Sequence, residues 1–428
     1  MKKINIAIIG LGNIGSYLFK YLKKNKEILS KKNNCVPNIV YVSARSKNKK
    51  RGIKIDNKIW LKNYLDATKS KKIDLIVELI GGAEGAAKKL VFNALKNKKH
   101  VVTANKALIS KYGDQLSKIA EKNRVNLEFE ASVCGGVPII RSLKEGLIAN
   151  KIKKVYGIFN GTSNYILSSM EYENKSFIDV LNKAKALGYA ESNPSADING
   201  DDVAAKLKIL SSLCFNSFLN NNIHVEGIKN IDKEDIENAK RLGYKIKLLG
   251  SAELINKNIY QRVHPTMIKK SSYVASIDGV LNAVIIEGHP VGQSVIQGEG
   301  AGPAATTSAL ISDISSIMRG NIKFPFSISD KERNVHKFKN IQERSFSAYL
   351  RFEVKDKPGV LSNITKIFSQ NNVSIKRLIQ SPNRSKASSS IIIISHESKD
   401  KSLNKIIKKI NKKNYIFRKS KLIRIDNI

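Results

Sequence analysis

A short apolar run that leads into a glycine-rich turn constrains the fold of this chain more than any other feature. Residues 4–10 read INIAIIG, and the turn Gly10-Leu-Gly12-Asn-Ile-Gly15 opens a helix expected from about Ile14 to Leu29. In a βαβ unit the first glycine permits a tight turn, the second lets a pyrophosphate approach, and the third allows close helix–strand packing. The helix N-terminus supplies N–H donors for phosphates. The motif predicts dinucleotide binding, although a glycine turn with a purely structural role would have the same spacing.

Strand-like and helix-like segments alternate along the N-terminal part of the chain. Such alternation is typical of βαβ units and a parallel sheet. We therefore expect residues 1–131 to form an α/β, Rossmann-like NAD(P)-binding domain. The further strands are expected at 38–44, 73–80, 100–104 and 125–131, and the further helices at 84–97 and 106–122.

Beyond residue 131 the regular alternation of strands and helices ends, and the chain divides into further units. Residues 132–297 mix helices and strands and predict an α+β domain, and the return segment 298–320 contains a helical run that can pack back on the first sheet. Residues 321–345 are polar, lack clear periodicity and look like a linker. Residues 346–428 read strand, helix, strand, strand, helix, strand, which is the ferredoxin-like order.

Composition limits the partners and the compartment. The formal charge is +39, but the lysines are scattered among Asn and Ile and form no basic arm, so we expect composition bias rather than a polyanion-binding surface, and no nucleic acid. No apolar stretch is long enough to cross a membrane. Cys35, Cys134 and Cys214 are too few and too far apart for a disulfide framework or a zinc site. A cytoplasmic protein without a membrane partner is the expectation.

The residues that follow the second strand bear on the choice between NAD and NADP. An Asp or Glu at this place commonly holds the ribose 2′-hydroxyl of NAD. Here the segment reads Val42-Ser-Ala-Arg45-Ser-Lys47, with no carboxylate and two cations. We expect NADP, with Arg45 on the 2′-phosphate, while NAD stays possible because a basic residue arises easily by chance in so Lys-rich a chain.

Two other segments lie at strand ends, on the side of the sheet where ligands bind. They are Glu78-Leu-Ile-Gly81-Gly and Thr103-Ala-Asn-Lys106. A lysine directly after an apolar strand can reach into the cleft, although it can also be a solvated lysine that begins a helix. Lys106 is therefore a candidate site residue.

Carboxylates and lysines are densest between Gly188 and Lys206. Asp202 and Lys206 are four residues apart and share one face of a helix, while Glu191 and Asp197 precede that helix on a loop. The carboxylate can orient the lysine, and burial could lower the pKa of Lys206 toward general acid–base use. The two loop carboxylates can bind the ammonium of an amino-acid substrate. A surface ion pair with a capping carboxylate is the simpler alternative.

In combination these segments resemble homoserine dehydrogenases over roughly residues 4–325. The motifs that carry the resemblance are GLGNIG, VELIGG, TANKALI, EASVCGGVPII, GIFNGTSNYIL, GYAESNPSADINGDDVAAKLKIL and QGEGAGPAATTSAL, in that order. The stretch from Glu191 to Lys206 is highly specific, whereas the glycine fingerprint is not. Asn13-Ile14 stand where Thr-Val is common in the family, a mild departure that affects only cofactor contacts.

The resemblance implies an NAD(P)H-dependent reduction of L-aspartate 4-semialdehyde to L-homoserine, in threonine, methionine and isoleucine biosynthesis. Lys206 would exchange a proton with the substrate oxygen, Lys106 would be the second lysine near nicotinamide and substrate, and Asp202 would orient the reacting group. The substrate would be bound by Glu191, Asp197 and Gly188, and residues 132–297 would carry catalysis, substrate binding and dimerisation. The expected cofactor contacts are Gly10, Leu11, Gly12, Asn13, Ile14, Gly15, Arg45, Gly81, Thr103, Lys106 and Gly300.

The resemblance also implies a sodium ion and an amino-acid effector. The ion would be held by the loop residues Glu130, Val133, Gly135 and Val137, partly through backbone carbonyls, in a structural role. The C-terminal unit resembles an ACT domain, with Asp356-Lys-Pro-Gly359 between its first strand and first helix. Threonine is the expected effector and a homodimer or homotetramer the expected assembly, although the domain could serve dimerisation alone.

Two other functions are compatible with parts of the sequence. An acylating semialdehyde dehydrogenase would use Cys134, which lies in a Gly-rich loop after a strand, but no histidine is near it in sequence and the Glu191–Lys206 motif would have no purpose. A nucleotide-sensing regulator would combine the same two domain types without catalysis. We also expect a single activity, because there is no room for an aspartate kinase domain.

Overall fold

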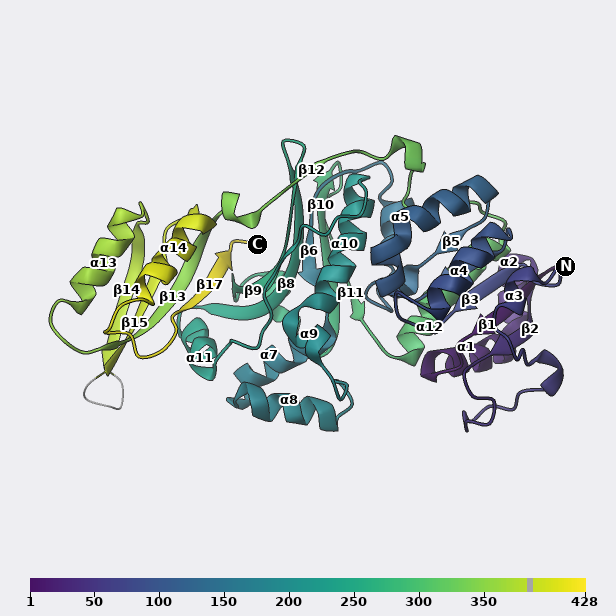
Figure 1. The fold of residues 1–428 in the computed structure, drawn as a ribbon, viewed down its shortest axis with the longest axis horizontal. Coiled ribbons are helices and arrows are strands. Elements are labelled where there is room, and N and C mark those ends of the chain that lie inside the picture. The colour runs from purple at the N-terminus through teal and green to yellow at the C-terminus, as the bar shows by residue number, and fades with distance from the viewer. Residues whose placement is uncertain (383–387) are drawn as a thin grey trace.

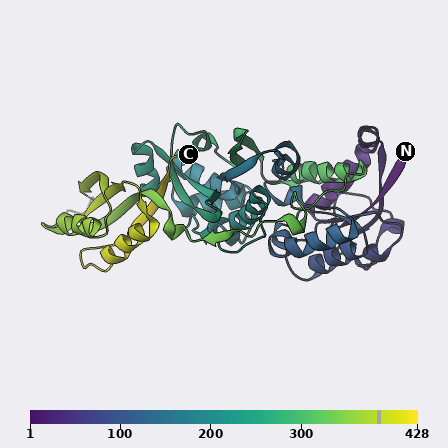
Figure 2. The same cartoon turned by 90° about the horizontal axis from the view of Figure 1, so that it is seen from above.

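The computed structural model describes residues 1–382 and 388–428 and arranges three units in a row. Figure 1 shows the N-terminal unit at one end, a mixed unit in the middle and the C-terminal unit at the other end, and Figure 2 shows the same order from above. The chain ends where its last strand reaches the middle unit.

The N-terminal unit is built on a parallel sheet, as the alternation of strands and helices predicted. The strand order is β2-β1-β3-β4-β5, and every neighbouring pair is parallel. The strands are β1 Lys2–Ile9, β2 Cys35–Ser43, β3 Leu75–Glu78, β4 His100–Thr103 and β5 Leu127–Glu128, and the connecting helices are α1 Asn13–Lys24, α2 Lys26–Asn33, α3 Asp66–Lys69, α4 Ala86–Lys96 and α5 Lys106–Asn123.

Several expected elements of this unit are shorter than the sequence pattern indicated, and α1 and β5 show why. The helix expected to reach Leu29 ends at Lys24, because Asn25 leaves helical geometry and its side chain donates a hydrogen bond to the carbonyl of Tyr21 at 3.0 Å. The second helix, α2, then starts at Lys26. The strand expected at 125–131 spans only Leu127–Glu128, because the chain turns into a short 3-10 helix directly afterwards.

Helix α12 (Pro303–Met318) returns from the middle unit and packs on the N-terminal sheet. Its buried Ala309, Leu310 and Ile314 share a hydrophobic core with Ile6 and Ile8 of β1. Full burial of a leucine or isoleucine side chain contributes about 1.5–3 kcal/mol relative to exposure. The first sheet therefore depends on residues almost 300 positions away in the sequence.

The middle unit places helices against a largely antiparallel sheet. The strands β11-β10-β6-β8-β9 are neighbours in that order. They comprise β6 Lys151–Ile158, β8 Tyr244–Ile255, β9 Asn258–Lys269, β10 Leu281–His289 and β11 Gly292–Glu299; the helices are α6 Ile139–Arg141, α7 Gly161–Glu173, α8 Phe177–Ala186, α9 Ser195–Asn199, α10 Asp201–Phe215 and α11 Lys233–Arg241, and β7 His224–Val225 pairs with β9.

The pattern of apolar residues did not indicate three of these elements. Strand β11 is polar and half exposed, so it lacks an apolar face. Helix α11 is short and highly charged. Helix α9 lies within the segment expected to be a loop, so Asp197 is in a helical turn. Elements of this kind are stabilised by their neighbours more than by their own pattern.

The C-terminal unit has the ferredoxin-like order that the sequence predicted. Its sheet is ordered β17-β13-β15-β14, with two helices. The elements are β13 Ser345–Lys355, α13 Val360–Gln370, β14 Ile375–Pro382, β15 Ser388–Ser395, α14 Asp400–Ile410 and β17 Lys421–Asp426, and the short β16 Ser398–Lys399 pairs with β13.

The middle and C-terminal sheets are joined edge to edge. Strand β17 pairs in parallel with β9, with Ile425 opposite Met267, so the two units share one twelve-stranded sheet. The segment expected to be a linker is also packed. It contains β12 (Lys337–Lys339), which pairs with β9, and it buries Phe326 and Arg333. The C-terminal unit is therefore not tethered by a flexible connection alone.

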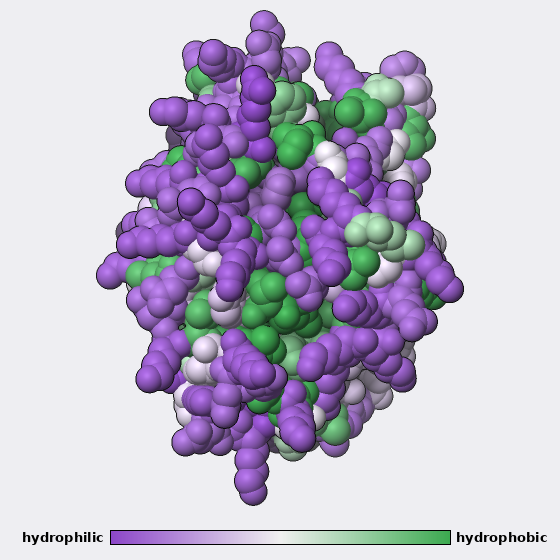
Figure 3. Space-filling model, turned by 90° about the vertical axis from the view of Figure 1, so that its right-hand side faces the viewer, coloured by the Kyte–Doolittle hydropathy of each residue, from purple (hydrophilic) through white to green (hydrophobic). Residues whose placement is uncertain are grey.

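The surface of the N-terminal unit is largely hydrophilic. Figure 3 shows hydrophilic side chains over most of the N-terminal end of the molecule, with hydrophobic side chains gathered between them. Among the residues described, no helix combines the length and apolar character needed to span a membrane.

Candidate functional site

The glycine turn has the geometry that close phosphate approach requires. Gly10 has φ +108°, and a Cβ there would lie 2.4 Å from the carbonyl oxygen of Leu79. A Cβ on Gly15 would lie 2.0 Å from the carbonyl oxygen of Gly10, so both positions require glycine. A Cβ on Gly12 would meet nothing within 4 Å. The backbone at Gly12 is therefore open to a ligand, at the N-terminus of α1.

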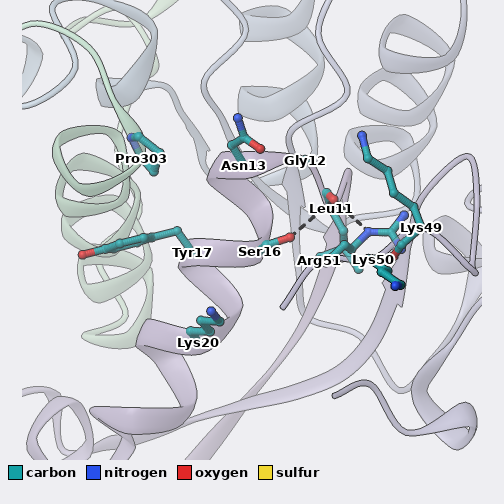
Figure 4. Close-up of a pocket in the computed structure, with 10 residues that line it drawn as sticks. All are labelled: Leu11, Gly12, Asn13, Ser16, Tyr17, Lys20, Lys49, Lys50, Arg51 and Pro303. Carbon is teal, nitrogen blue, oxygen red and sulfur yellow. Dashed lines mark hydrogen bonds between the residues drawn. The ribbon is translucent and has the colours of Figure 1, made fainter. Parts of the chain in front are cut away.

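A cavity of about 250 Å³ lies beside this turn, between α1, the segment after β2 and the start of α12. Arg51 closes one side, because its Nε donates to the carbonyl of Leu11 at 3.0 Å and one Nη to the carbonyl of Lys49 at 2.8 Å. Figure 4 shows Arg51 reaching Leu11. The lining residues are Leu11, Gly12, Asn13, Ser16, Tyr17, Lys20, Lys49, Lys50, Arg51 and Pro303.

The cations that line this cavity differ from the one chosen on sequence grounds. Arg45 is exposed on the same connection and does not line the cavity, whereas Lys49 and Lys50 do. Lys20 of α1 adds a third ammonium group. The run of basic residues after β2 was the available signal, but the sequence alone did not show which of them face the glycine turn.

The ends of β3 and β4 are tied together by hydrogen bonds. The carboxylate of Glu78 accepts from the backbone N–H of Gly81 at 3.0 Å and from the hydroxyl of Thr103 at 2.5 Å. Asn105 caps α5 through the N–H of Leu108 at 3.0 Å. These contacts hold the start of α5, where Lys106 is the first residue.

Lys106 and Lys206 converge on one carboxylate from two different units. The Nζ of Lys106 lies 2.8 Å from Oδ1 of Asp202, and the Nζ of Lys206 lies 2.8 Å from Oδ2. Lys206 also donates to the carbonyl of Phe159 at 2.7 Å. Asp202 and Lys206 are buried on α10, whereas the Lys106 side chain is 43% exposed. The cluster is thus open on the side of the N-terminal unit.

Asn160 joins Asp197 to this cluster, and sequence reasoning missed it. Its Nδ2 donates to Oδ1 of Asp197 at 2.6 Å and to Oδ2 of Asp202 at 2.8 Å. Asn160 is separated from the end of β6 by one residue and caps α7. Asn160 lies in the motif GIFNGTSNYIL, but no role was assigned to it, because a polar residue between an apolar strand and a helix is common to many helix N-caps.

The charges of the cluster reinforce one another. Burial alone would raise the pKa of Asp202, but the two lysines and Asn160 hold it below its usual range. Burial alone would lower the pKa of Lys206, but the Asp202 carboxylate raises it above its usual value. The expected lowering of the Lys206 pKa is therefore wrong, because the paired carboxylate outweighs burial. Burial raises the pKa of Asp197, despite the Asn160 hydrogen bond.

Glu191 and Gly188 lie outside this cluster. Glu191 is exposed between α8 and α9, and within the described part of the chain it has no hydrogen bond or ion pair. Gly188 has φ +74° and open space around its Cβ position. The structure brings together Lys106, Asp197, Asp202 and Lys206, and it leaves Glu191 facing solvent.

The loop from Glu130 to Val137 is buried between the N-terminal and middle units. The Glu130 carboxylate accepts from the backbone N–H groups of Ile140 at 2.8 Å and Arg141 at 2.6 Å. Burial nevertheless raises its pKa to about 7. Gly135 has φ +37°, and a Cβ there would lie 2.7 Å from the carbonyl oxygen of Gly300. The described residues contain no group of three or more His, Cys, Asp or Glu side chains suited to a metal.

Cys134 does not have the surroundings of a nucleophile. Its side chain is fully buried, and burial raises the pKa of the thiol. A thiolate nucleophile needs the opposite, an accessible sulfur with a lowered pKa. The acylating alternative is therefore disfavoured.

A second cavity, of about 350 Å³, lies in the C-terminal unit where β13 leads into α13. Gly359 caps α13 with φ +84°, a conformation that favours glycine. The cavity is lined by Val354, Lys355, Asp356, Lys357, Pro358, Gly359, Val360, Leu361, Gln380, Ser389 and Ile391. Figure 1 shows α13, which borders this cavity, in a different unit from α5 and α10, which carry the lysine cluster.

Comparison with known proteins covers all three units. Residues 10–130 match the model for the homoserine dehydrogenase NAD binding domain, residues 138–315 that for homoserine dehydrogenase, and residues 348–414 that for the ACT domain. The chain is 38% identical over 435 residues, the full length of both, to a homoserine dehydrogenase of Neisseria gonorrhoeae.

Solved structures are similar over the same span. The crystal structure of a homoserine dehydrogenase from Thiobacillus denitrificans matches with a TM-score of 0.93 and 36% identity, covering 100% of this chain and 99% of that one. A hyperthermophilic archaeal homoserine dehydrogenase in complex with NADPH matches with a TM-score of 0.65 and 25% identity, covering 75% of this chain and 99% of that one. The chain therefore belongs to the homoserine dehydrogenase family, with a C-terminal ACT domain.

Proposed function

We propose that this oxidoreductase interconverts L-aspartate 4-semialdehyde and L-homoserine with NADP(H) at the cluster of Lys106, Asp202 and Lys206. The convergence of two ammonium groups from two units on one buried carboxylate is the observation that carries the proposal. The cluster lies at the start of α5, next to the strand ends where nicotinamide cofactors bind in sheets of this kind. A carbonyl oxygen placed there meets two cationic donors.

Each residue of the cluster has a separate role in carbonyl reduction. The bound nicotinamide supplies or accepts the hydride. Lys206, held protonated by Asp202, gives a proton to the substrate oxygen on reduction and takes it back on oxidation. Lys106 adds a second positive charge as charge develops on that oxygen. Asp197, and Glu191 if its loop moves inward, would bind the substrate ammonium.

NADP is the better fit to the cofactor cavity. No carboxylate follows β2, and three lysines line the cavity beside the glycine turn: Lys20, Lys49 and Lys50. Ammonium groups suit a 2′-phosphate, and the archaeal relative was solved with NADPH. Arg45 stays a predicted contact at the exposed edge of the same connection.

A sodium ion would fit the loop by the chemistry of its donors. Backbone carbonyls of Glu130, Val133, Gly135 and Val137 are neutral hard oxygen ligands. The Glu130 carboxylate is already engaged by two backbone N–H groups, so its carbonyl is the better candidate. Buried Glu128 and Glu130 help to raise the pKa of Asp313, after burial itself, and a cation would offset that repulsion. Thermal unfolding in sodium chloride and in choline chloride would test this role.

The C-terminal cavity is the proposed site of the regulatory effector. The backbone from Lys355 to Gly359 and the side chains of Gln380 and Ser389 offer polar contacts to an amino acid, and threonine is the proposed ligand. Binding at a distinct site that alters turnover would be allosteric. A homodimer or homotetramer and a cytoplasmic location remain predictions from family resemblance and from the reduced cysteines.

The decisive experiment follows absorbance at 340 nm with L-homoserine and NADP⁺ for the wild type, Lys206→Met and Lys208→Met. Lys208 is a matched control, because it is buried on the same helix but donates to Asn221 at 2.6 Å, away from the cluster. We expect Lys206→Met to lose turnover by a factor on the order of 1000 and Lys208→Met to keep it. Absence of wild-type turnover with NADP⁺ and NAD⁺, in both directions, would overturn the proposal.

A further inference from the structure

We propose that Asn160 is a positioning residue that fixes two carboxylates relative to each other. One is Asp202, which orients the catalytic Lys206, and the other is Asp197, which would bind the substrate ammonium. The inference rests on the proposed function and adds a residue to it. One amide nitrogen has two hydrogens, and each meets a different carboxylate, Asp197 at 2.6 Å and Asp202 at 2.8 Å. Asn160 is 5% exposed, so water does not readily replace these bonds.

The orientation of the Asn160 amide is determined by its own helix cap. Its Oδ1 accepts from the backbone N–H of Ser163 at 2.7 Å, at the start of α7. A backbone N–H can only donate, so the amide oxygen must face Ser163 and the amide nitrogen must face the carboxylates. The backbone is confined as well, because a Cβ on Gly161 would lie 2.5 Å from the carbonyl oxygen of Val280.

The contacts of Asp202 show why a neutral donor is needed here. Its Oδ1 is paired with Lys106, and its Oδ2 is shared by Lys206 and Asn160. The amide thus fixes Oδ2 without adding a third charge, and Oδ2 in turn places the Lys206 ammonium. The neighbouring Phe159 carbonyl accepts from the same ammonium at 2.7 Å, so Asn160 and its neighbour set the position of Lys206 from both sides.

Asp197 gains its position from the same amide. Its Oδ1 is held by Asn160, and its second oxygen is left for a substrate ammonium. Two carboxylates close together repel each other, and a shared donor reduces that cost. Binding of the substrate amine and protonation of the substrate oxygen are therefore coupled through one side chain, and loss of the amide should affect both KM for homoserine and kcat.

Asn160→Asp separates this role from helix capping. Aspartate has the same shape and is an equally good N-cap, so the cap of α7 is preserved. The introduced carboxyl faces Asp197 on α9, Asp202 and Lys206 on α10, and Lys106 on α5. When ionised it repels both carboxylates, and when protonated it can still donate one hydrogen bond.

We expect Asn160→Asp to lower kcat/KM for homoserine by about 100-fold or more at pH 8, because two hydrogen bonds to charged groups are lost. The deficit relative to wild type should shrink as the pH falls toward 6, while KM for NADP⁺ stays unchanged. Steady-state kinetics across this pH range, with both substrates varied, provide the measurement. A purely structural residue would give no such dependence on pH.

Two further variants keep the test decisive. Ser176→Ala removes the N-cap of the remote helix α8 and should lower the melting temperature without changing kcat. If Asn160→Asp does not fold, Asn160→Ser keeps a capping hydroxyl that is too short to bridge both carboxylates, and it should show the same loss of kcat with raised KM for homoserine. Wild-type kinetics in a folded Asn160 variant would overturn the inference, whereas an inactive wild type would instead overturn the proposed function.

Discussion

Two buried charge clusters of this molecule have opposite compositions. At the candidate active site one carboxylate, Asp202, meets two lysines. Between the middle and C-terminal units one guanidinium, Arg351, meets four carboxylates. These lie at 3.0 Å (Asp232), 2.5 Å (Glu234), 2.7 Å (Asp235) and 2.9 Å (Glu353).

The difference between the two clusters indicates that one can bind a ligand and that the other only stabilises the contact between two units. Arg351 is 2% exposed at its side chain, and its nitrogens are all engaged by carboxylates of α11 and β13. Lys106 is 43% exposed, and an ammonium has three N–H donors of which Asp202 takes one. Every nitrogen of Arg351 already has a carboxylate partner, whereas Lys106 in the active-site cluster retains N–H donors for a ligand.

Replacement of the shared carboxylate should have the largest effect. In Asp202→Asn the two lysines lose their common partner, and burial then lowers the pKa of Lys206. Lys206 then loses its proton as the pH rises. The defect in semialdehyde reduction, which needs the protonated amine as donor, should therefore grow from pH 6 to pH 9, whereas the defect in homoserine oxidation, which needs the neutral amine as acceptor, should shrink. We expect kcat to fall about 100- to 10,000-fold, measured by pH–rate profiles in both directions. A pH–rate profile of Asp202→Asn parallel to that of the wild type would show that Asp202 does not control the protonation of Lys206.

Removal of the guanidinium should affect stability rather than chemistry. Arg351→Met leaves Asp235, which is fully buried, without its cation, and we expect a loss of about 3–5 kcal/mol in the free energy of unfolding. Turnover without effector should persist while the chain is folded, and any response to threonine should weaken. Chemical denaturation and the 340 nm assay provide the two readouts.

The matched control for that variant is Arg418→Met. Arg418 is paired with Glu353 at 3.4 Å, but its side chain is 77% exposed. Exposed ion pairs contribute about 0–1 kcal/mol, so its loss should be hardly measurable. If both variants unfolded equally, burial would not be what distinguishes the Arg351 contact.

Lys49 and Lys50, which line the cavity beside the glycine turn, are a third group of cations and can also donate hydrogen bonds to a ligand. Lys49→Gln combined with Lys50→Gln should raise KM for NADP⁺ about 10-fold and change KM for NAD⁺ much less, because only NADP⁺ carries the 2′-phosphate. Lys31→Gln with Lys32→Gln, on the exposed side of α2, removes the same charge elsewhere and should leave both constants unchanged. Equal effects on the two cofactors would place the 2′-phosphate elsewhere, and Arg45 would be tested next.

The smallest effect is expected at Glu191. Because its side chain is exposed and outside the cluster, Glu191→Gln should raise KM for homoserine by no more than about 5-fold, the range of an exposed ion pair. Asp197→Asn should raise it further, since Asp197 is held by Asn160. Comparable effects at both positions would show that the loop before α9 closes over the substrate.

Several features of this protein were determined by sequence alone because they depend on local spacing. Gly15 is required for a local reason, because a Cβ there would collide with the carbonyl of Gly10 in the same turn, whereas Gly10 is confined by Leu79 after β3. Asp202 and Lys206 meet because a four-residue separation brings side chains to one helix face. The parallel sheet and the ferredoxin-like order followed from the alternation of apolar runs.

Tertiary structure decided what depends on segments far apart in the chain. Lys106 reaches Asp202 only because α5 and α10 come together from two units, and Asn160 meets both carboxylates only once α9 and α10 pack beside the end of β6. The direction of the Lys206 pKa shift depended on whether burial or the Asp202 carboxylate was the stronger influence, which spacing cannot show. The pairing of β17 with β9 is equally invisible in the sequence, since backbone hydrogen bonds between distant strands leave no periodic pattern of side chains.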